Sequence, residues 1–161
     1  MKKFIFQTIG LFVLIGGAFF LFSSNFQPNN LPFVPQTPVS KHLQINEAKL
    51  TVEIADTQTK RNKGLGGRQS LATDEGMLFV FDTTGKHPFW MKGLTFPLDF
   101  VWIRKDKVVD LTPNVEPPAS GAQDASLPIY QSKEDVDKAL EVNAGTIEKL
   151  HIKVGDTVKI E

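Results

Sequence analysis

The chain has 161 residues and equal numbers of basic and acidic side chains, 18 of each, so its formal net charge is zero. That length suits one domain with a few dozen residues left over. A balanced charge argues against a general nucleic-acid binder, which would carry an excess of basic residues. The absence of cysteine excludes a disulfide framework, a thiolate zinc site and a cysteine nucleophile.

The N-terminal 22 residues have the pattern of a transmembrane signal anchor. Residues 4–22 carry no charge, and as a helix they would be about 28 Å long, close to the hydrocarbon thickness of a bilayer. Lys2 and Lys3 precede this run, and no basic residue follows before Lys41. The positive-inside rule therefore predicts a single-pass protein of the cytoplasmic membrane, with its N-terminus in the cytoplasm and its remainder extracytoplasmic. A cleaved signal peptide is the alternative, because Gly16-Gly17-Ala18 loosely fits a small-residue cleavage site.

Residues 23–40 are uncharged and rich in Pro and Asn, with four prolines among them. Proline at this density prevents a helix or a central strand, so the segment is predicted to be an extended tether. The folded unit is then a single domain over residues 41–161, which is long enough for one hydrophobic core.

Most of this domain has the pattern of short strands. Apolar residues alternate with polar ones over 43–54, with Asn46-Glu47 as the turn of a hairpin. Asp56 or Thr57 is placed to cap a short helix that runs to Lys63 and that Gly64 ends. Further strands are predicted at 77–81, 98–103, 108–111 and 157–160.

Two segments of the second half favour other structures. Residues 112–129 contain four prolines and few large apolar residues, which indicates a long loop. Ser132 with Asp135 resembles a capping box for a short helix that includes Leu140, and Ile147 with Leu150 is predicted to form a second helical turn. The expected fold is therefore mainly β, a compact sandwich or barrel of short strands with one or two short helices.

Standard cofactor and metal motifs are absent from the sequence. The three histidines have no metal-ligand spacing, and there is neither a phosphate-binding loop nor a nucleophile elbow. We therefore expect no metal and no cofactor.

Candidate functional residues gather between positions 61 and 99, where charged side chains interrupt apolar runs. Charges next to buried strands must reach the surface, form ion pairs or face a pocket. One interpretation is an internal salt bridge of Asp99 with Arg61 or Lys92, with the aromatic residues as ordinary core. The other is a pocket walled by aromatic residues, with ligand-binding candidates Arg61, Arg68, Glu75, Phe89, Trp90, Lys92 and Asp99.

The same segment resembles domain of unknown function family 192, also called uncharacterised protein family 0127. The matching motifs are Arg61 with Gly64-Leu65, Arg68 with Ser70-Leu71, Gly76 to Phe81, Phe89 to Lys92, and Pro97 to Asp99. The resemblance continues to about residue 160. It implies a small β-rich fold, often secreted or membrane-attached, and it implies no established activity.

The chain departs from the family pattern at two places. Gly66 stands where relatives usually have Met, and Gly93-Leu94 stands where they usually have Asn-Thr. An Asn replaced by Gly93 loses two hydrogen-bond donors and an acceptor.

Two classes of function follow. The first is a membrane-anchored module that binds a small polar or anionic ligand, with Trp90 and Phe89 stacking on it and basic residues meeting an anionic group. The second is a carboxylate-dependent hydrolase or isomerase, with Glu75 or Asp99 as acid or base. A protein-interaction or assembly role through the loop near 113–129 stays open, with an unknown partner. From the sequence we expect two partners: the membrane, through residues 4–22, and a small polar or anionic ligand. We expect no binding of nucleic acid.

Overall fold

The computed structural model of this protein describes residues 40–161. The expected anchor at residues 4–22, and the tether up to residue 39, lie outside the described residues. Within 40–161, no helix combines the length and the apolar character needed to cross a membrane.

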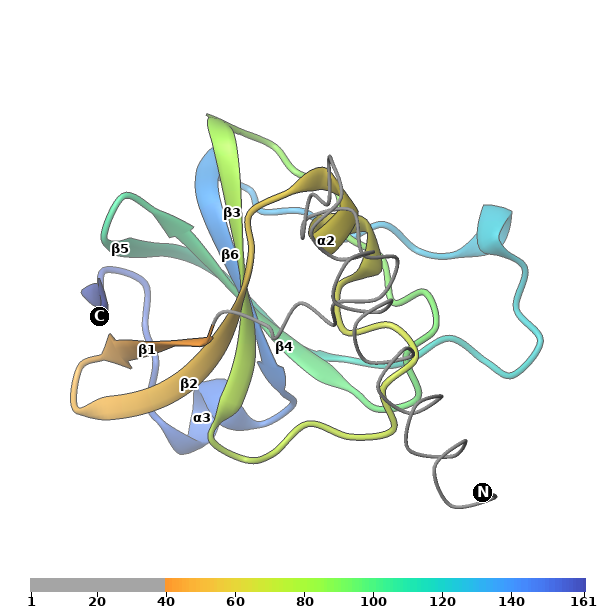
Figure 1. Cartoon of the computed structure of the whole chain (residues 1–161), viewed down its shortest axis with the longest axis horizontal. Coiled ribbons are helices and arrows are strands. Elements are labelled where there is room, and N and C mark those ends of the chain that lie inside the picture. The colour runs from red at the N-terminus through yellow and green to blue at the C-terminus, as the bar shows by residue number, and fades with distance from the viewer. Residues whose placement is uncertain (1–39) are drawn as a thin grey trace, which may run out of the picture. The chain divides into compact units, whose positions relative to one another are not determined.

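Seven strands form one sheet in the order β5-β4-β6-β3-β2-β1-β7 (Figure 1). The pairing of β2 with β3 is parallel, and α2 lies in the connection between them; the other pairings are antiparallel. The elements in chain order are β1 (Ser40–Ile45), β2 (Ala48–Ala55), α2 (Gln58–Lys63), β3 (Glu75–Gly85), β4 (Leu98–Arg104), β5 (Lys107–Val115), the 3-10 turn η2 (Asp124–Ser126), β6 (Val136–Asn143), α3 (Thr146–Lys149) and β7 (Val158–Ile160).

The sheet curls so that its two edges approach each other. Lys107 at the start of β5 forms an isolated bridge with Thr157, next to β7. The Val158 amide donates to the Asp106 carbonyl over 2.8 Å, and the Val108 amide donates to the Asp156 carbonyl over 3.0 Å. The domain is therefore a mainly β half-barrel with two short helices. The mainly β prediction is confirmed, and the sheet forms half a barrel rather than a two-sheet sandwich.

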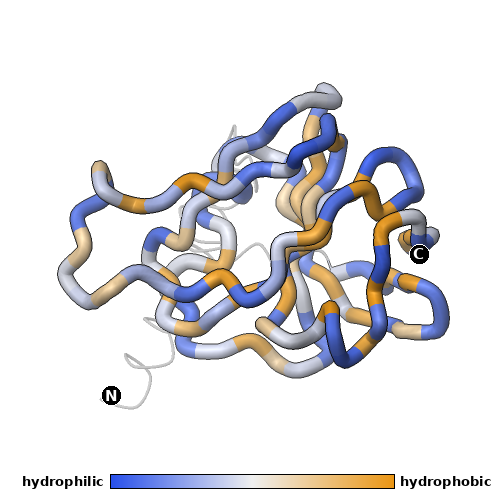
Figure 2. The backbone as a smooth tube through the Cα atoms, turned by 180° about the vertical axis from the view of Figure 1, so that it is seen from behind, coloured by the Kyte–Doolittle hydropathy of each residue, from blue (hydrophilic) through white to orange (hydrophobic). Residues whose placement is uncertain are grey.

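Side chains alternate between the two faces of this sheet, as the pleat of a strand requires. In β4, Phe100 and Trp102 join one core cluster, together with Phe79 and Phe89. Val101 and Ile103 of the same strand join the other cluster, on the opposite face. Figure 2 shows the hydrophobic stretches of the strands joined by hydrophilic turns. A core cluster thus covers each face of the sheet. A polar side chain in a central strand is therefore buried whichever face it points to.

The short helix α2 forms where the sequence predicts it. Thr57 is extended at φ −114°, and its hydroxyl accepts from the Lys60 amide over 3.3 Å. Gly64 ends the helix at a φ of +50°, and its amide donates to the Lys60 carbonyl over 2.9 Å. The helix carries no acidic residue in its first turn, so the Thr57 cap supplies the N-terminal hydrogen bond.

The predicted helix after Ser132 is wrong. Residues Val136–Asn143 form the strand β6, which lies between β4 and β3 in the middle of the sheet. The Ser132 hydroxyl accepts from the Glu134 amide over 3.0 Å, so it stabilises a local turn that precedes a strand. Because β6 is buried on both faces, its apolar residues do not alternate along the sequence, and tertiary pairing decided its conformation.

The predicted loop 112–129 begins too early, since β5 extends through Val115 and pairs there with Leu98. The second helical turn is confirmed as α3. The strand predicted at 157–160 is confirmed as β7, and the hairpin over 43–54 is confirmed as β1 and β2.

Candidate functional site

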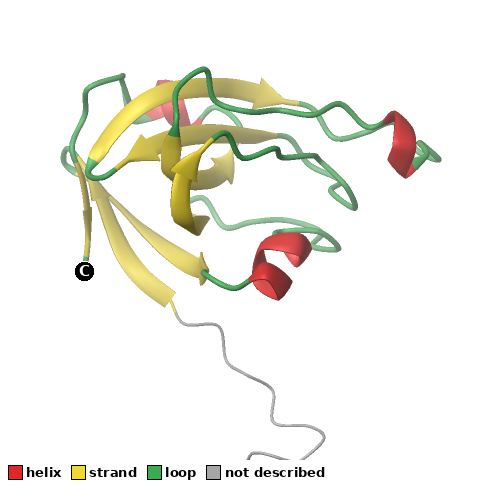
Figure 3. Ribbon diagram, turned by 90° about the horizontal axis from the view of Figure 1, so that it is seen from above, coloured by secondary structure: helices red, strands yellow, loops and turns green. Residues whose placement is uncertain are grey.

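A pocket of about 760 Å³ opens at one end of the half-barrel. Its walls come from α2 with the turn that follows it, and from the connection between β3 and β4. Figure 3 shows α2 and the long loops projecting beyond the strands at this end. The pocket is lined by Gln58, Arg61, Asn62, Lys63, Gly64, Leu65, Gly66, Phe79, Phe81, Asp82, Thr83, His87, Pro88, Phe89, Trp90, Lys92, Gly93, Leu94, Ile129 and Glu141.

Arg61 fastens α2 to the sheet along one wall. Its Nη1 donates to the carbonyl of Val80 in β3 over 2.8 Å and to the carbonyl of Asp56 over 2.9 Å. Nη2 lies 3.6 Å from a carboxylate oxygen of Asp82, and the guanidinium stands 5.8 Å from the centre of the Phe81 ring. Much of the donor capacity of this side chain is therefore used within the protein, and Arg61 shapes the wall as well as charging it.

Phe89 holds the opposite wall in place. Its ring makes edge-to-face contacts with four other aromatic rings, at centroid distances from 4.9 to 6.1 Å. Its amide and carbonyl each bond to the backbone of Tyr130 over 2.8 Å, which ties this segment to the long loop. Phe89 thus anchors residues 87–94 onto the sheet, and little of its ring is exposed to a ligand.

Trp90 and Lys92 follow on the same segment and are far more exposed. Trp90 is 54% exposed, the largest exposure of any described aromatic residue in the pocket lining. The Lys92 ammonium forms an ion pair with Asp124 of η2, and both side chains are more than half exposed. Trp90 therefore offers a free ring at the pocket mouth, whereas Lys92 connects the wall to the long loop.

Glu141 lies at the floor of the pocket, on β6. It pairs in register with Met77 of β3 and with Phe100 of β4, and it shares the sheet face of the aromatic cluster. The residue is 3% exposed, and its Oε2 is buried without a hydrogen-bond partner in the described chain. Burial raises the pKa of Glu141 to about 8, because a charged carboxylate loses its hydration there.

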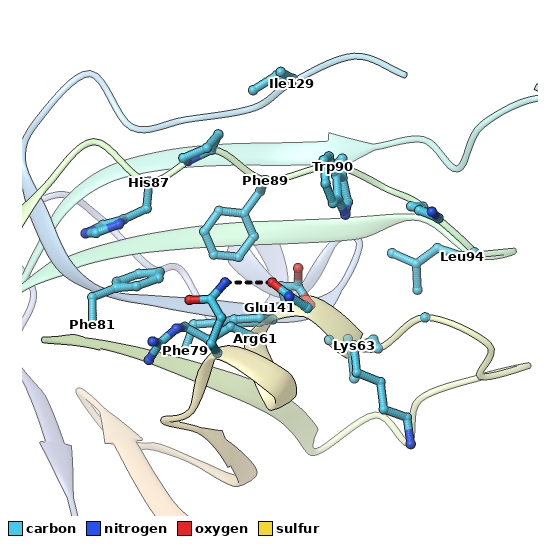
Figure 4. Close-up of a pocket in the computed structure, with 18 of the residues that line it drawn as sticks. Arg61, Lys63, Phe79, Phe81, His87, Phe89, Trp90, Leu94, Ile129 and Glu141 are labelled. Carbon is cyan, nitrogen blue, oxygen red and sulfur yellow. Dashed lines mark hydrogen bonds between the residues drawn. The ribbon is translucent and has the colours of Figure 1, made fainter. Parts of the chain in front are cut away.

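Figure 4 shows how the pocket surrounds this carboxyl group. Phe89 and Trp90 lie on one side of Glu141, and Phe79 and Arg61 lie on the other. The dashed line in the same view marks the hydrogen bond from Gln58 Nε2 to Asn62 Oδ1, 2.7 Å long, between two residues of α2 that line the pocket. The site therefore combines apolar walls, polar and basic side chains from α2, and one unpartnered acidic group.

Glycines keep part of the wall as bare backbone. A Cβ on Gly66 would lie 3.1 Å from the carbonyl oxygens of Lys63 and Lys92, so a side chain there would force both segments to shift. The Gly67 amide donates to the Gly93 carbonyl over 2.8 Å and closes this end of the pocket. Gly93 has a φ of +69°, in the left-handed region that Gly and Asn both tolerate. The change from Asn to Gly in the family pattern thus removes an amide side chain while the backbone conformation can stay the same.

The structure brings Arg61, Phe89, Trp90 and Lys92 together around the pocket, and it places the other three candidates elsewhere. Arg68 makes two hydrogen bonds of 2.7 Å to the Glu53 carboxylate, which raises the pKa of Arg68 and lowers that of Glu53. Glu75 is exposed at the start of β3.

Asp99 is fully buried on the other face of the sheet, away from the pocket lining. Its two oxygens accept from the backbone amides of Asn114 and Ile147, each over 2.8 Å. The expected salt bridge of Asp99 with Arg61 or Lys92 is wrong, because two amides take the place of a cation. Asp99 thereby joins β4 to the end of β5 and to the start of α3.

Sequence reasoning missed Glu141 as a site residue. The signal was the position of a Glu between Leu140 and Val142, because a charge between two buried residues implies either a partner or a pocket. The helix predicted over this region concealed it, since on a surface helix Glu141 would have faced solvent.

Comparisons with known proteins identify relatives of the whole domain. The model of a family described as DUF192, "Uncharacterized ACR", matches residues 41–160. A crystal structure from Sinorhizobium meliloti 1021, described as a proposed transcription regulator, is 30% identical with a TM-score of 0.70, covering 79% of this chain and 98% of that one. A protein of unknown function from Novosphingobium aromaticivorans DSM 12444 has the same fold, at 23% identity and a TM-score of 0.64, covering 85% and 99%. A search of curated proteins gives no match.

Proposed function

Because this chain belongs to the DUF192 family, whose description assigns no activity, we propose a function from the pocket itself: the domain is a small-ligand-binding module. The observation that carries the proposal is the unpartnered carboxyl group of Glu141 at the floor of an open pocket of about 760 Å³. Ligand sites are typically concave, mostly apolar and equipped with a few well-placed polar groups. Aromatic and aliphatic walls, polar side chains from α2 and the buried carboxyl group of Glu141 match that description.

The geometry gives less support to a carboxylate pair. Glu75 and Asp99 do not line the pocket, and Asp99 is engaged by two backbone amides. A catalytic acid and base must face a shared cleft that a substrate can enter. The binding proposal therefore rests on Glu141 and does not invoke Glu75 or Asp99.

The description of the Sinorhizobium relative as a transcription regulator does not change this proposal. Recognition of DNA by a helix-turn-helix uses a helix that enters the major groove. In residues 40–161, α2 has six residues, α3 has four, and the whole chain carries no excess of positive charge. Small-ligand binding is thus the function that the described domain supports best.

We further propose that residues 4–22 hold this module on the outer side of the cytoplasmic membrane, on the strength of their uncharged sequence. Since the chain has no cysteine, a single Ala122→Cys change in the exposed long loop supplies a unique label. A membrane-impermeant maleimide should react with this variant in intact spheroplasts as fully as in permeabilised ones. Labelling only after permeabilisation would contradict the extracytoplasmic placement.

The binding proposal is tested by a thermal-shift screen of the full chain against sugars, nucleobases, aromatic acids, amides and alcohols. A ligand of the folded state, present at about 100 times its dissociation constant, stabilises the protein by roughly 2.7 kcal/mol. Hits should weaken in Trp90→Ala at the pocket mouth and persist in Val154→Ala, an equally exposed hydrophobic residue outside the pocket. The proposal fails if no compound shifts the transition, or if both variants respond as the parent does.

A further inference from the structure

We infer that the ligand of this pocket is a flat, uncharged ring compound that presents an N–H or O–H donor to the carboxyl group of Glu141. This inference rests on the proposed function and specifies the chemical class of the ligand. It names Glu141 as the residue that determines specificity.

Glu141 carries a buried oxygen that has no hydrogen-bond donor in the described chain. Buried polar atoms in folded proteins almost always have a hydrogen-bond partner, and an exception calls for an explanation. In the described chain, Glu141 Oε2 is the buried side-chain atom that lacks one. Asp99, on the neighbouring strand β4 and one register step away, shows how this fold satisfies a buried carboxylate that has no ligand to meet, with two backbone amides. Glu141 faces a pocket instead, so the missing donor is supplied from outside.

Aromatic and aliphatic side chains form the walls beside Glu141. Phe79 and Phe89 are buried and meet edge to face at 4.9 Å, so they form a rigid aromatic surface beside Glu141. Leu94 is buried on the same side, and Trp90 leaves a large ring surface free at the mouth. Aromatic side chains prefer offset or edge contacts with other rings. The free ring of Trp90 and this aromatic surface beside Glu141 therefore favour a flat ring compound as the ligand.

The charges around the pocket disfavour a charged ligand at its floor. The charged groups that line the pocket with Glu141 are Arg61 and Lys63 from α2, Lys92 from the opposite wall, and Asp82 from β3, which is paired with Arg61; His87 lines it as well. A cationic ligand would approach three basic side chains, of which Arg61 is paired with Asp82 and Lys92 with Asp124, and it would lose its hydration in the pocket. An anionic group placed at the floor brings no hydrogen-bond donor to Oε2, and it would meet a like charge wherever Glu141 is ionised.

An uncharged donor avoids both costs. It can donate to the Glu141 oxygen whether the carboxyl group is neutral or ionised. Burial holds the pKa of Glu141 near 8, so around pH 7 the group is mostly neutral and gives a cation little attraction. Ring N–H groups, amides and hydroxyls remain as the donors that suit the site.

The test uses one ring with three head groups: 2-naphthylmethanol, its methyl ether and 2-naphthylmethylammonium. Calorimetric titrations of the full chain are made with the parent protein, Glu141→Gln and Glu141→Leu. The Leu variant removes the acceptor at similar volume, and the Gln variant imitates the neutral carboxyl group. In the parent the alcohol should bind at least about tenfold more tightly than the ether, since a lost buried hydrogen bond costs about that much.

The preference for the alcohol should grow from pH 6 to pH 9 in the parent, because an ionised carboxylate only accepts hydrogen bonds. It should be independent of pH in Glu141→Gln and absent in Glu141→Leu. An unchanged preference in Glu141→Leu, or tighter binding of the ammonium probe than of the alcohol at pH 7, would overturn the inference while leaving the binding function standing. If none of the three probes binds the parent at concentrations up to their solubility, the inference is overturned, and the separate screen decides the fate of the binding function.

Discussion

The two faces of the sheet each bury one carboxyl group, and the two groups differ in what surrounds them. Asp99 of β4 pairs in register with Val142, and Phe100 pairs with Glu141, so the two acidic residues are one register step apart. Because side chains alternate along a strand, Asp99 and Glu141 lie on opposite faces. Asp99 accepts two amide hydrogen bonds, whereas Glu141 Oε2 has no partner and faces a pocket.

This difference shows that burial alone does not distinguish a structural acid from a functional one. Both residues are almost inaccessible, at 0% and 3% exposure. What separates them is the direction of the hydrogen-bond donors. The fold directs the backbone amides at the end of β5 and the start of α3 at Asp99, whereas none of the side chains that line the pocket around Glu141 bonds to its Oε2. The following predictions test that contrast, beginning with the largest effect.

The largest effect is expected from Glu141→Leu at alkaline pH. The folded protein keeps the Glu141 pKa near 8, well above the value of an exposed Glu, so between about pH 4.5 and pH 8 the unfolded chain releases a proton that the folded chain retains. The parent therefore loses stability as pH rises through this window, and the loss levels off above pH 8. The Leu variant has no such titration, so its stability advantage over the parent should grow by roughly 4–5 kcal/mol between pH 4 and pH 9.

Urea unfolding of both proteins across this pH range measures the effect. Glu141→Gln serves as the control, because it keeps a polar side chain of the same shape and removes only the titration. Its advantage over the parent should grow with pH in the same way. Parallel stability curves for the parent and Glu141→Gln would show that the carboxyl group is hydrated in solution, which contradicts its burial at the floor of the pocket.

Asp99→Ala should lower the free energy of unfolding, in contrast to Glu141→Leu, and it should do so with or without a ligand. The change leaves the amides of Asn114 and Ile147 buried without an acceptor, which costs about 3 kcal/mol in free energy of unfolding. Asp99→Asn keeps one carbonyl acceptor and should cost less. Ligand affinity should be unchanged in both variants under conditions where they are folded. A stable Asp99→Ala protein with lost ligand binding would place Asp99 in the site after all.

The contrast between these two acids also marks the limit of what the sequence predicted. Local signals gave the hairpin over 43–54 and the helix from Thr57 to Gly64, because turn residues and caps act within a few positions. They failed for β6, whose conformation depends on pairing with β3 and β4, strands 35 or more positions earlier in the chain.

The site residues, too, were predicted where the signal was local and missed where it depended on distant pairing. Aromatic and basic residues near the pocket were found, because Phe89, Trp90 and Lys92 stand together in one segment. Glu141 was not found, since only the register of β6 brings it beside Phe100. Asp99 was singled out correctly as a buried charge, but its amide partners lie at the end of β5 and the start of α3, which no local pattern around Asp99 reveals.

A smaller effect is expected at Arg68, which was a candidate for ligand binding and instead pairs with Glu53. Lysine cannot form both 2.7 Å bonds at once, so Arg68→Lys should lower the free energy of unfolding by about 1 kcal/mol near neutral pH. The pairing with Arg68 lowers the Glu53 pKa. The contribution of this ion pair to the free energy of unfolding is therefore fully present above the pKa of an exposed Glu, and it is lost as pH falls through the lowered Glu53 pKa. The difference between Arg68→Lys and the parent should therefore vanish at strongly acidic pH, while ligand binding stays unchanged.

Trp90→Phe should have the smallest effect on stability and the clearest effect on the optical response to ligand. Trp90 is 54% exposed, and substitutions at such positions usually change stability by less than about 0.5 kcal/mol. The chain has one other tryptophan, Trp102, which is fully buried and donates to the Thr112 hydroxyl over 2.9 Å. In the parent, a ligand in the pocket should change the emission of Trp90, and in Trp90→Phe the remaining emission of Trp102 should not respond. If the response persists in Trp90→Phe, the ligand reaches the aromatic cluster from a different direction, and the pocket between α2 and residues 87–94 is not its site.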